Sequence, residues 1–279
     1  MLLLFRMKLS IITVNYNNHQ GLQKTIESVI SQTWKDFEWI VIDGGSTDGS
    51  KELIEQYKQH FAYWCSEPDK GVYHAMNKGV AHANGEYVNF LNSGDAYYDE
   101  DVLWKINDLQ FDADIISGQA VRMDNHKPLC KFRGSLFLQL YVTTISHQGA
   151  FIKRSLLNTY PYDESLKIAS DWKFWLQTII WDNVKVKITD IVVAAQDMTG
   201  ISTCQNSRSI AVDQYEREKV LNEFFPLLLR KELEKYQHIL KSPFTLYGDY
   251  LYKNNHFLYA IGWRLLKSLV KLHKMTHRT

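Results

Sequence analysis

Residues 38–49 constrain the fold of this chain more than any other segment. After Glu38, residues 39–42 are apolar and rich in β-branched side chains, which is typical of a buried strand. The run ends at Asp43, turns through Gly44 and Gly45, and continues into polar residues suited to the start of a helix. This order predicts an α/β sheet with Asp43 at the carboxyl end of a strand, the edge where such sheets bind ligands. Alternatively, Asp43 is only a turn residue that caps the helix.

The first part of the chain alternates between strand and helix patterns. Strands are expected at residues 8–14, 38–42, 61–66 and 87–91. Helices are expected at residues 21–32, 46–60 and 72–83, with the second capped by Ser46, Thr47 or Asp48. Strand–helix units joined by short loops predict a mostly parallel central sheet flanked by helices.

The pattern is looser in the second half. Further strands are expected at residues 114–117 and 120–122 and after residue 150, one or two closing strands at residues 184–193, and a helix at residues 169–181. Residues 136–145 fit either type. From residue 206 onward the pattern is helical, so we expect an α/β domain over residues 1–205 and a helical C-terminal extension over residues 206–279.

The composition argues against several classes of protein. A formal net charge of +1 gives no general reason to expect binding to nucleic acid. Cys65, Cys130 and Cys204 lie far apart without metal-binding spacing, so we expect free thiols in a reducing compartment. No uncharged apolar run reaches the roughly 18 residues of a transmembrane helix. We therefore expect a cytoplasmic protein.

The end of the chain has a basic amphipathic pattern. Residues 256–275 combine aromatic and aliphatic side chains with Lys and Arg, and no acidic residue follows Lys253. This pattern predicts a helix that binds peripherally to the inner leaflet of the membrane. A helix that packs on the α/β domain and exposes its lysines explains the pattern equally well.

Polar side chains follow three of the expected strands. Asn15, Asp43 and Asp95 each come at a strand end, and parallel strands bring such ends to one edge of a sheet. Clustered carboxylates repel one another unless a cation or hydrogen-bond donors lie between them. Asp43 suits the N–H and O–H groups of a nucleobase or ribose, and Asp95 suits a hard divalent cation that also binds phosphate. The alternative for Asp95 is a plain turn residue.

Five short motifs occur in order along this part of the chain. They are Thr-Val-Asn-Tyr-Asn at 13–17, Asp-Gly-Gly-Ser-Thr-Asp-Gly at 43–49, Glu-Pro-Asp-Lys-Gly at 67–71, Ala-Met-Asn-Lys-Gly at 75–79 and Phe-Leu-Asn-Ser-Gly-Asp at 90–95. Over roughly residues 8–200 the chain resembles the family 2 glycosyltransferases of GT-A fold found in bacterial capsule, exopolysaccharide and O-antigen synthesis.

The resemblance implies an activity and its partners. A hexose or N-acetylhexosamine would move, with inversion, from a nucleoside-diphosphate sugar to a saccharide acceptor, for which we expect a lipid-linked saccharide. A UDP-sugar is the default donor, a GDP-sugar is the open alternative because Asp43 does not settle the base, and the cofactor would be Mn²⁺ or Mg²⁺.

The resemblance also assigns roles to residues. Asp43 matches the carboxylate that holds the nucleobase, and Asp171 matches the base that deprotonates the acceptor hydroxyl. Asp95 matches the last aspartate of the metal-binding DxD motif, whose other carboxylate is absent here. The other contacts that it implies with the nucleotide sugar are Val14, Asn15, Tyr16, Gly44, Asp69, Lys70, Gly71, Asn77, Lys78, Asn92, Ser93 and Gly94.

Two further residues, His147 and Gln148, resemble a segment on the acceptor side, where they could touch the acceptor, the diphosphate or the metal. Asp171 has a plain alternative as an acidic residue in the first turn of a helix capped by Ser170. The thinned DxD motif keeps open a non-catalytic nucleotide-sugar-binding or scaffold protein of the same fold.

Two other activities fit the residues less well. A nucleotidyltransferase would need a basic, glycine-rich loop at residues 15–20, which is absent. A phosphatase with Asp43 as nucleophile would need an acidic partner where Gly45 stands.

Overall fold

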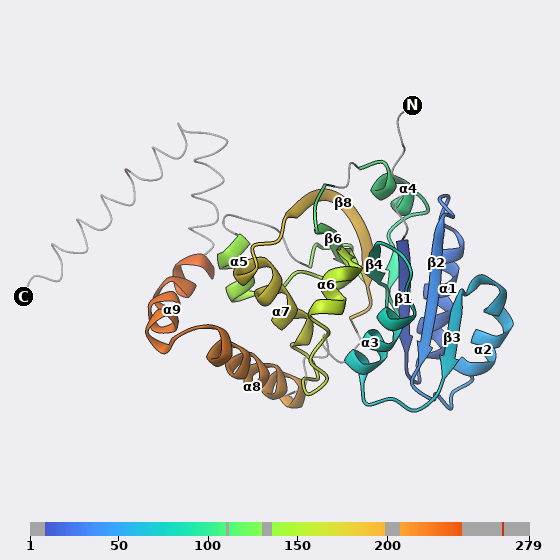
Figure 1. Cartoon of the computed structure of the whole chain (residues 1–279), viewed down its shortest axis with the longest axis horizontal. Helices are drawn as coiled ribbons and strands as arrows, with labels where there is room; N and C mark the ends of the chain where they lie inside the picture. The colour runs from blue at the N-terminus through green and yellow to red at the C-terminus, as the bar shows by residue number, and fades with distance from the viewer. Residues whose placement is uncertain (1–8, 110–111, 130–135, 199–206, 242–263, 265–279) are drawn as a thin grey trace, which may run out of the picture. The chain divides into compact units, whose positions relative to one another are not determined.

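The computed structural model describes residues 9–109, 112–129, 136–198, 207–241 and 264 (Figure 1). Its strands form one eight-stranded sheet in the order β3-β2-β1-β4-β7-β6-β8-β5. The chain divides into two compact units. The first comprises Met1–Lys131 with Thr143–Val220, and the second Phe132–Val142 with Leu221–Thr279. All strands belong to the first unit.

The first half of the sheet is parallel, as predicted. Its strands are β1 (Leu9–Asn15), β2 (Phe37–Asp43), β3 (Tyr63–Ser66) and β4 (Tyr87–Phe90). The helices between them are α1 (His19–Ile30), α2 (Ser50–Tyr57), which continues as a 3₁₀ turn at Lys58–His60, and α3 (Val72–His82). Each connection is a strand–helix–strand unit, which accounts for the parallel pairing.

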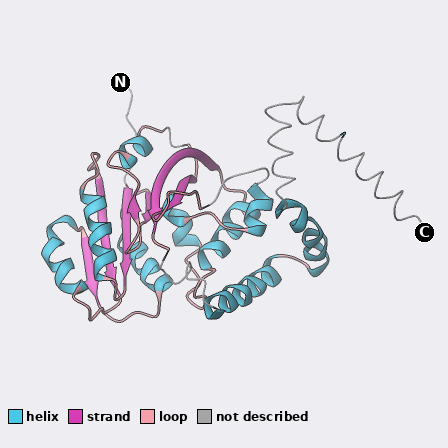
Figure 2. Cartoon of the chain, turned by 180° about the vertical axis from the view of Figure 1, so that it is seen from behind, coloured by secondary structure: helices cyan, strands magenta, loops and turns pink. Residues whose placement is uncertain are grey.

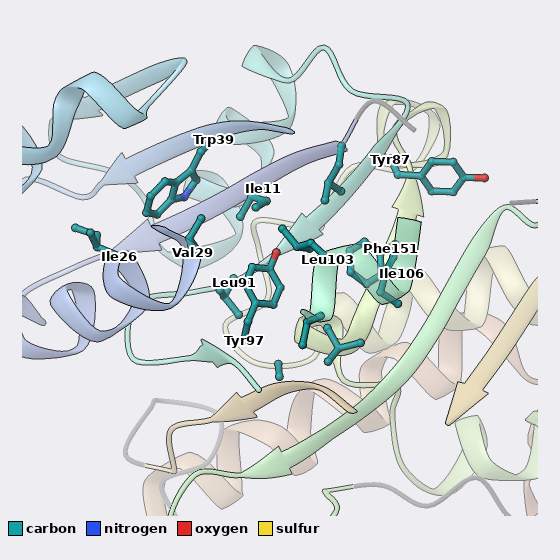
Figure 3. Packing of buried hydrophobic residues seen from close by; sticks show 14 of the residues in the cluster. Ile11, Ile26, Val29, Trp39, Tyr87, Leu91, Tyr97, Leu103, Ile106 and Phe151 are labelled. Carbon is teal, nitrogen blue, oxygen red and sulfur yellow. The ribbon is translucent and has the colours of Figure 1, made fainter. Parts of the chain in front are cut away.

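Alternating side chains of the parallel strands pack on helices at both faces of the sheet. On one face, Ile26 and Val29 of α1 join Ile11 and Trp39 in the core (Figure 3). On the other face α3 approaches closely, because a β-carbon at Gly79 would lie only 2.4 Å from Ile12 Cγ2. Figure 2 shows the helices over the strands from behind. The strand ends thereby lie together at one edge of the sheet.

The second half of the sheet is mixed rather than parallel. Its strands are β5 (Ala96–Tyr97), β6 (Ile115–Arg122), β7 (Ala150–Lys153) and β8 (Val186–Gln196). β7 pairs antiparallel with both β4 and β6, β8 pairs antiparallel with β5, and only the β6–β8 pairing is parallel. The two strands predicted at 114–117 and 120–122 are one strand with register shifts around Gly118, where a β-carbon would lie 2.5 Å from Val193 Cγ2.

The remaining helices complete the described elements. They are α4 (Val102–Asn107), α5 (Leu136–Val142), α6 (Arg154–Thr159), α7 (Ser170–Trp175) with a π-helical turn at Leu176–Trp181, α8 (Ser207–Phe224) and α9 (Leu227–Lys241), together with a 3₁₀ turn at His147–Gly149. The sequence predicted neither α4, α6 nor β5. The ambiguous segment 136–145 contains a helix.

The second unit has its own aromatic contacts. Phe225 meets Tyr141 edge to face, with ring centroids 5.7 Å apart, and Phe137 at 6.3 Å. The division at residues 205 and 206 stays a prediction.

Some predictions concern residues that the structure does not describe. Apart from Arg264, the tail predicted at 256–275 lies outside the described residues, as do Cys130 and Cys204, whereas Cys65 is a free thiol. Within the described part of the chain, no helix is both long and apolar enough to cross a membrane.

Candidate functional site

The carboxyl ends of the parallel strands place the predicted polar residues side by side. Asn15 is in register with Asp43, and Asp43 with Ser66. The loop after β4 joins the same edge, because Ser93 N–H donates to the Val14 carbonyl at 3.0 Å. The Val14 side chain is buried, so Val14 contributes its backbone carbonyl to this edge.

Asp43 is fully buried and hydrogen-bonded on both oxygens. Its Oδ1 accepts from Asn15 Nδ2 at 2.7 Å and Ser46 Oγ at 2.6 Å, and its Oδ2 from Ser46 N at 2.9 Å and Ser66 Oγ at 2.6 Å. Burial by itself would raise the pKa of Asp43, but the bonds from Ser46, Ser66 and Asn15 outweigh it and lower the pKa below its usual 3.8. The carboxylate is therefore charged and satisfied by its own chain.

The turn after Asp43 differs from the sequence prediction. The helix begins at Ser50 instead of residue 46, with Gly49 at φ +92° before it and no side-chain cap. Ser46 donates to Asp43, and its hydroxyl accepts from Asn17 N. Asp48 accepts from the N–H groups of His19 and Ser50. The candidate caps thus serve the turn between strand and helix, because the buried carboxylate needs donors more than the helix needs an acceptor.

Two of the residues predicted to bind the nucleotide, Tyr16 and Asp69, lie beside Gly44. Tyr16 is 66% exposed, and its ring faces the turn. Asp69 reaches the same place from the loop after β3, and its Oδ1 accepts from Gly71 N at 2.8 Å. Lys70, between Asp69 and Gly71 in the sequence, is exposed.

Asn77 and Lys78, on α3, bond within the chain. The Asn77 amide donates to the Tyr162 carbonyl at 2.8 Å and accepts from Tyr162 N at 2.9 Å, while Lys78 pairs with Glu67. These contacts tie α3 to two loops, so neither side chain joins the group around Gly44 in the structure.

The loop after β4 carries a second buried carboxylate. Asp95 is 5% exposed, and its oxygens accept from Gln148 Nε2 at 2.9 Å and Asp197 N at 3.0 Å. Burial is the main cause that raises the pKa of Asp95 to about 6, and the nearby Asp197 carboxylate adds to it. Gly94, at φ +102°, lies beneath Asp197, since a β-carbon there would be 3.1 Å from Asp197 Oδ2.

His147 connects this loop to Asp171. His147 Nδ1 lies 3.2 Å from Asp171 Oδ2, and its Nε2 lies 3.3 Å from Asn92 Nδ2. With the Asn92 amide donating to Nε2, the Nδ1–H is donated to Asp171. The side chains of His147 and Asp171 are 14% and 13% exposed, so solvent or a ligand still reaches the pair.

Asp171 is fixed by two further neighbours. Its Oδ1 accepts from Trp172 N at 2.8 Å and lies 3.3 Å from the Tyr73 hydroxyl, which donates to the Ile168 carbonyl at 2.6 Å. Burial, with the Asp171 charge next, raises the pKa of Tyr73 well above its usual value, so this hydroxyl stays protonated. The carboxylate thus has a fixed orientation at the start of α7.

Comparisons with known proteins identify the family of this chain. The model of the family Glycosyl transferase family 2 matches residues 10–160, more than half of the chain. The chain belongs to glycosyl transferase family 2. The family predicted from the five motifs is therefore confirmed, and the protein is a glycosyltransferase.

Two relatives illustrate the similarity of this glycosyltransferase in sequence. An uncharacterized glycosyltransferase of Mycobacterium tuberculosis (strain CDC 1551 / Oshkosh) is 32% identical over 213 residues, which are 73% of this chain and 80% of the relative. A PGL/p-HBAD biosynthesis glycosyltransferase of Mycobacterium bovis (strain BCG / Pasteur 1173P2) is 28% identical over 200 residues, 68% of this chain and 77% of the relative.

Two solved structures share the GT-A fold of this glycosyltransferase. Residues 1–349 of S. aureus TarS in complex with UDP-GlcNAc superpose with a TM-score of 0.60 at 20% identity, over 78% of this chain and 71% of that one. The mannosyltransferase PcManGT from Pyrobaculum calidifontis, in complex with GDP-Man and Mn²⁺, gives 0.59 at 18% identity, over 95% and 81%. At these identities the likeness establishes the fold alone.

Two residues near the site of this glycosyltransferase were not predicted from the sequence. Asp197 follows β8, but the strand predicted there ended at residue 193, so no strand-end signal pointed to it. Glu216 of α8 accepts from the N–H groups of residues 167–169 at 2.7, 2.9 and 3.0 Å, directly before α7. Nothing in a helical pattern distinguishes a glutamate that binds a distant loop.

Proposed function

We propose that this glycosyltransferase moves a hexose or N-acetylhexosamine from a nucleoside-diphosphate sugar, most simply a UDP-sugar, to a saccharide acceptor, with inversion at the anomeric carbon. The observation that carries the proposal is the link Asp171–His147–Asn92, which joins a carboxylate of the second half to the loop after β4. Structural neighbours that bind UDP-GlcNAc and GDP-Man support a nucleotide-sugar donor.

The proposed base is Asp171. Its Oδ2 would take the proton of the acceptor hydroxyl while that oxygen bonds to the anomeric carbon and the bond from this carbon to the diphosphate oxygen breaks. One displacement from the opposite face inverts the configuration. His147 holds the carboxylate in place through its Nδ1–H, and general-base help of this kind typically contributes about 10²–10⁴-fold.

The residues of the β4 loop fit a divalent cation. No group of three His, Cys, Asp or Glu side chains suited to a metal occurs among the described residues. However, the Asp95 and Asp197 carboxylates are neighbours, and Asn92 Oδ1 is buried without a hydrogen-bond partner in the described part of the chain. Mg²⁺ or Mn²⁺ often uses only one or two protein carboxylates together with substrate phosphates. We propose that Asp95, Asp197 and Asn92 hold it, where it would neutralise charge on the departing diphosphate.

The setting proposed for this activity is surface polysaccharide synthesis at the cytoplasmic side of the membrane, with a lipid-linked saccharide as acceptor. The relative named for PGL/p-HBAD biosynthesis supports a biosynthetic role. The basic pattern of residues 256–275 supports peripheral contact with the inner leaflet. Flotation with anionic vesicles tests this contact: it should be lost when the tail is deleted, and vesicle binding that survives the deletion contradicts it.

Calorimetric titration of UDP and GDP into the full chain, with and without Mn²⁺, tests the donor site. We expect metal-dependent binding of one nucleotide that is lost in Asp95→Ala and in the milder Asp95→Asn. Asp99→Asn, which changes a carboxylate paired with Lys105, is the matched control and should bind normally. Failure of folded wild-type protein to bind either nucleotide with metal present would overturn the proposal in favour of a scaffold role.

A further inference from the structure

Asp43 has no lone pair left for a nucleobase. Each of its oxygens accepts two hydrogen bonds at 2.6–2.9 Å from its own chain, and the residue is 0% exposed. An ionised carboxylate offers about four acceptor positions. A base could bind Asp43 directly only by displacing Ser46, Ser66 or Asn15, which would leave buried donors without partners.

A different carboxylate lies over the turn that follows. A β-carbon added at Gly44 would be 2.6 Å from Asp69 Oδ2 and 3.2 Å from Tyr16 Cδ2. The Asp69 carboxylate and the Tyr16 ring therefore meet above Gly44, and any larger residue at position 44 would push them away. They come from the loops after β3 and β1, respectively, at the ligand-binding edge of the sheet.

The two oxygens of Asp69 have different surroundings. Oδ1 accepts from Gly71 N at 2.8 Å, which fixes the carboxylate plane. For Oδ2 no hydrogen-bond donor occurs among the described residues, and this is the oxygen above Gly44. Tyr16 beside it is 66% exposed, so a flat ring and one charged acceptor are presented together.

We propose that Asp69, and not Asp43, reads the base of the donor, that Tyr16 stacks on it, and that the pair selects uridine. This inference rests on the proposed function, since it assumes a nucleotide donor at this edge. Uracil carries a single ring N–H, N3–H, which Asp69 Oδ2 accepts. Guanine presents two adjacent N–H donors that call for both carboxylate oxygens side by side, whereas Oδ1 is turned to Gly71 N and Oδ2 is the oxygen that lies above Gly44. Cytosine has an acceptor at N3, which faces the carboxylate unfavourably.

The test is calorimetric titration of UDP, CDP and GDP into wild type and Asp69→Asn, all with Mn²⁺. Gly71 N–H needs an acceptor, so the asparagine oxygen takes the Oδ1 position and its NH₂ the Oδ2 position. We expect wild type to prefer UDP over CDP and GDP. In Asp69→Asn, UDP affinity should fall about tenfold or more, and the ratio of UDP to CDP affinity should fall further, because the new NH₂ donates to cytosine N3.

Matched variants separate the base contact from general effects. Glu52→Gln removes one negative charge from the first turn of α2 and should leave the affinities unchanged. Tyr16→Ala should weaken all three nucleotides, whereas Tyr16→Phe, which keeps the ring, should not. Thermal unfolding of each variant verifies that it is folded.

Two results would overturn the inference while the proposed function stands. One is equal UDP affinity in wild type and folded Asp69→Asn, and the other is a wild-type preference for GDP over UDP. If wild type binds none of the three nucleotides, the proposed function fails together with the inference.

Discussion

Two buried carboxylates that follow parallel strands of the sheet have opposite environments. Asp43, after β2, has four donors around it and a lowered pKa, whereas Asp95, after β4, has two donors, an adjacent carboxylate and a pKa raised to about 6. Both are almost fully buried, so burial does not distinguish them. The difference lies in the number of donors that the chain brings to each. The Asp43 group is complete without a ligand, and the group of Asp95, Asn92 and His147–Asp171 keeps acceptors that a ligand can use.

The largest expected effect comes from a substitution of Asp171, in the group that also contains Asp95, Asn92 and His147. In Asp171→Asn the side chain keeps its size but loses its basicity, so turnover should fall by roughly 10²–10⁴-fold. Nucleotide binding should persist. Steady-state rates of sugar transfer together with calorimetry would measure both.

Asp182→Asn, beyond the π-helical turn that follows α7, is the matched control for this change. Its carboxylate bonds to Gln177 on the same helix, and its turnover should stay near that of wild type. Full turnover in Asp171→Asn would show that Asp171 is not the catalytic base. The contrast between a satisfied carboxylate group and a ligand-binding one would then lose its functional meaning.

The next largest effect concerns the stability that Asp43 and its hydrogen-bond donors give to the fold. Asp43→Asn replaces one accepting oxygen by an NH₂ that faces buried donors, which should lower the free energy of unfolding by about 1–3 kcal/mol. Urea unfolding at pH 7 would measure the loss. A stability equal to that of wild type would mean that the four bonds of Asp43 do not hold the turn.

The pH dependence of this loss sharpens the same comparison. Because the pKa of Asp43 is lower in the folded than in the unfolded chain, its stabilisation is complete above the unfolded value of 3.8 and is lost as the pH falls through the folded value. The stability difference between wild type and Asp43→Asn should therefore be constant from pH 7 to about pH 5 and shrink below pH 4. A difference that grows on acidification would contradict the lowered pKa.

The smallest effect should come from a residue that positions Asp171 without contact to it. Glu216→Gln keeps one of the two oxygens that bind the N–H groups of residues 167–169, at a cost of about 1 kcal/mol. We expect kcat to fall several-fold with KM for the donor unchanged, because the loop before Asp171 loosens while the nucleotide edge stays intact. A change in the KM for the donor at constant kcat would contradict the idea that Glu216 positions Asp171.

The first half of the fold was predictable because its signals are local. β1, β2, β3 and β4 are short apolar runs, and α1 and α3 have helical periodicity, so each is visible within a window of about ten residues. The two-residue strand β5 has no such window and exists because it pairs with β8. The single strand β6 was split in the prediction because Gly118 interrupts its apolar pattern, although β8 pairs along its length.

Candidate site residues followed the same division. The motifs gave Asp43, Asp69 and Asp95 as candidate site carboxylates, because loops at strand ends keep their polar residues close in sequence, and the family resemblance gave Asp171. Asp197 and Glu216 were missed because each acts on a loop far away in sequence.

By itself, the sequence determined an α/β fold and the edge at which its polar residues gather, since strand and turn preferences depend on near neighbours, and its motifs carried the resemblance to the glycosyltransferase family. Only the tertiary structure decided which carboxylates are already satisfied. Asn15 and Ser66 reach Asp43 from positions 28 and 23 residues away, and nothing local to Asp43 reveals them. The physical reason is that a hydrogen bond needs its partners within about 3 Å, and only the pairing of the strands brings these side chains that close.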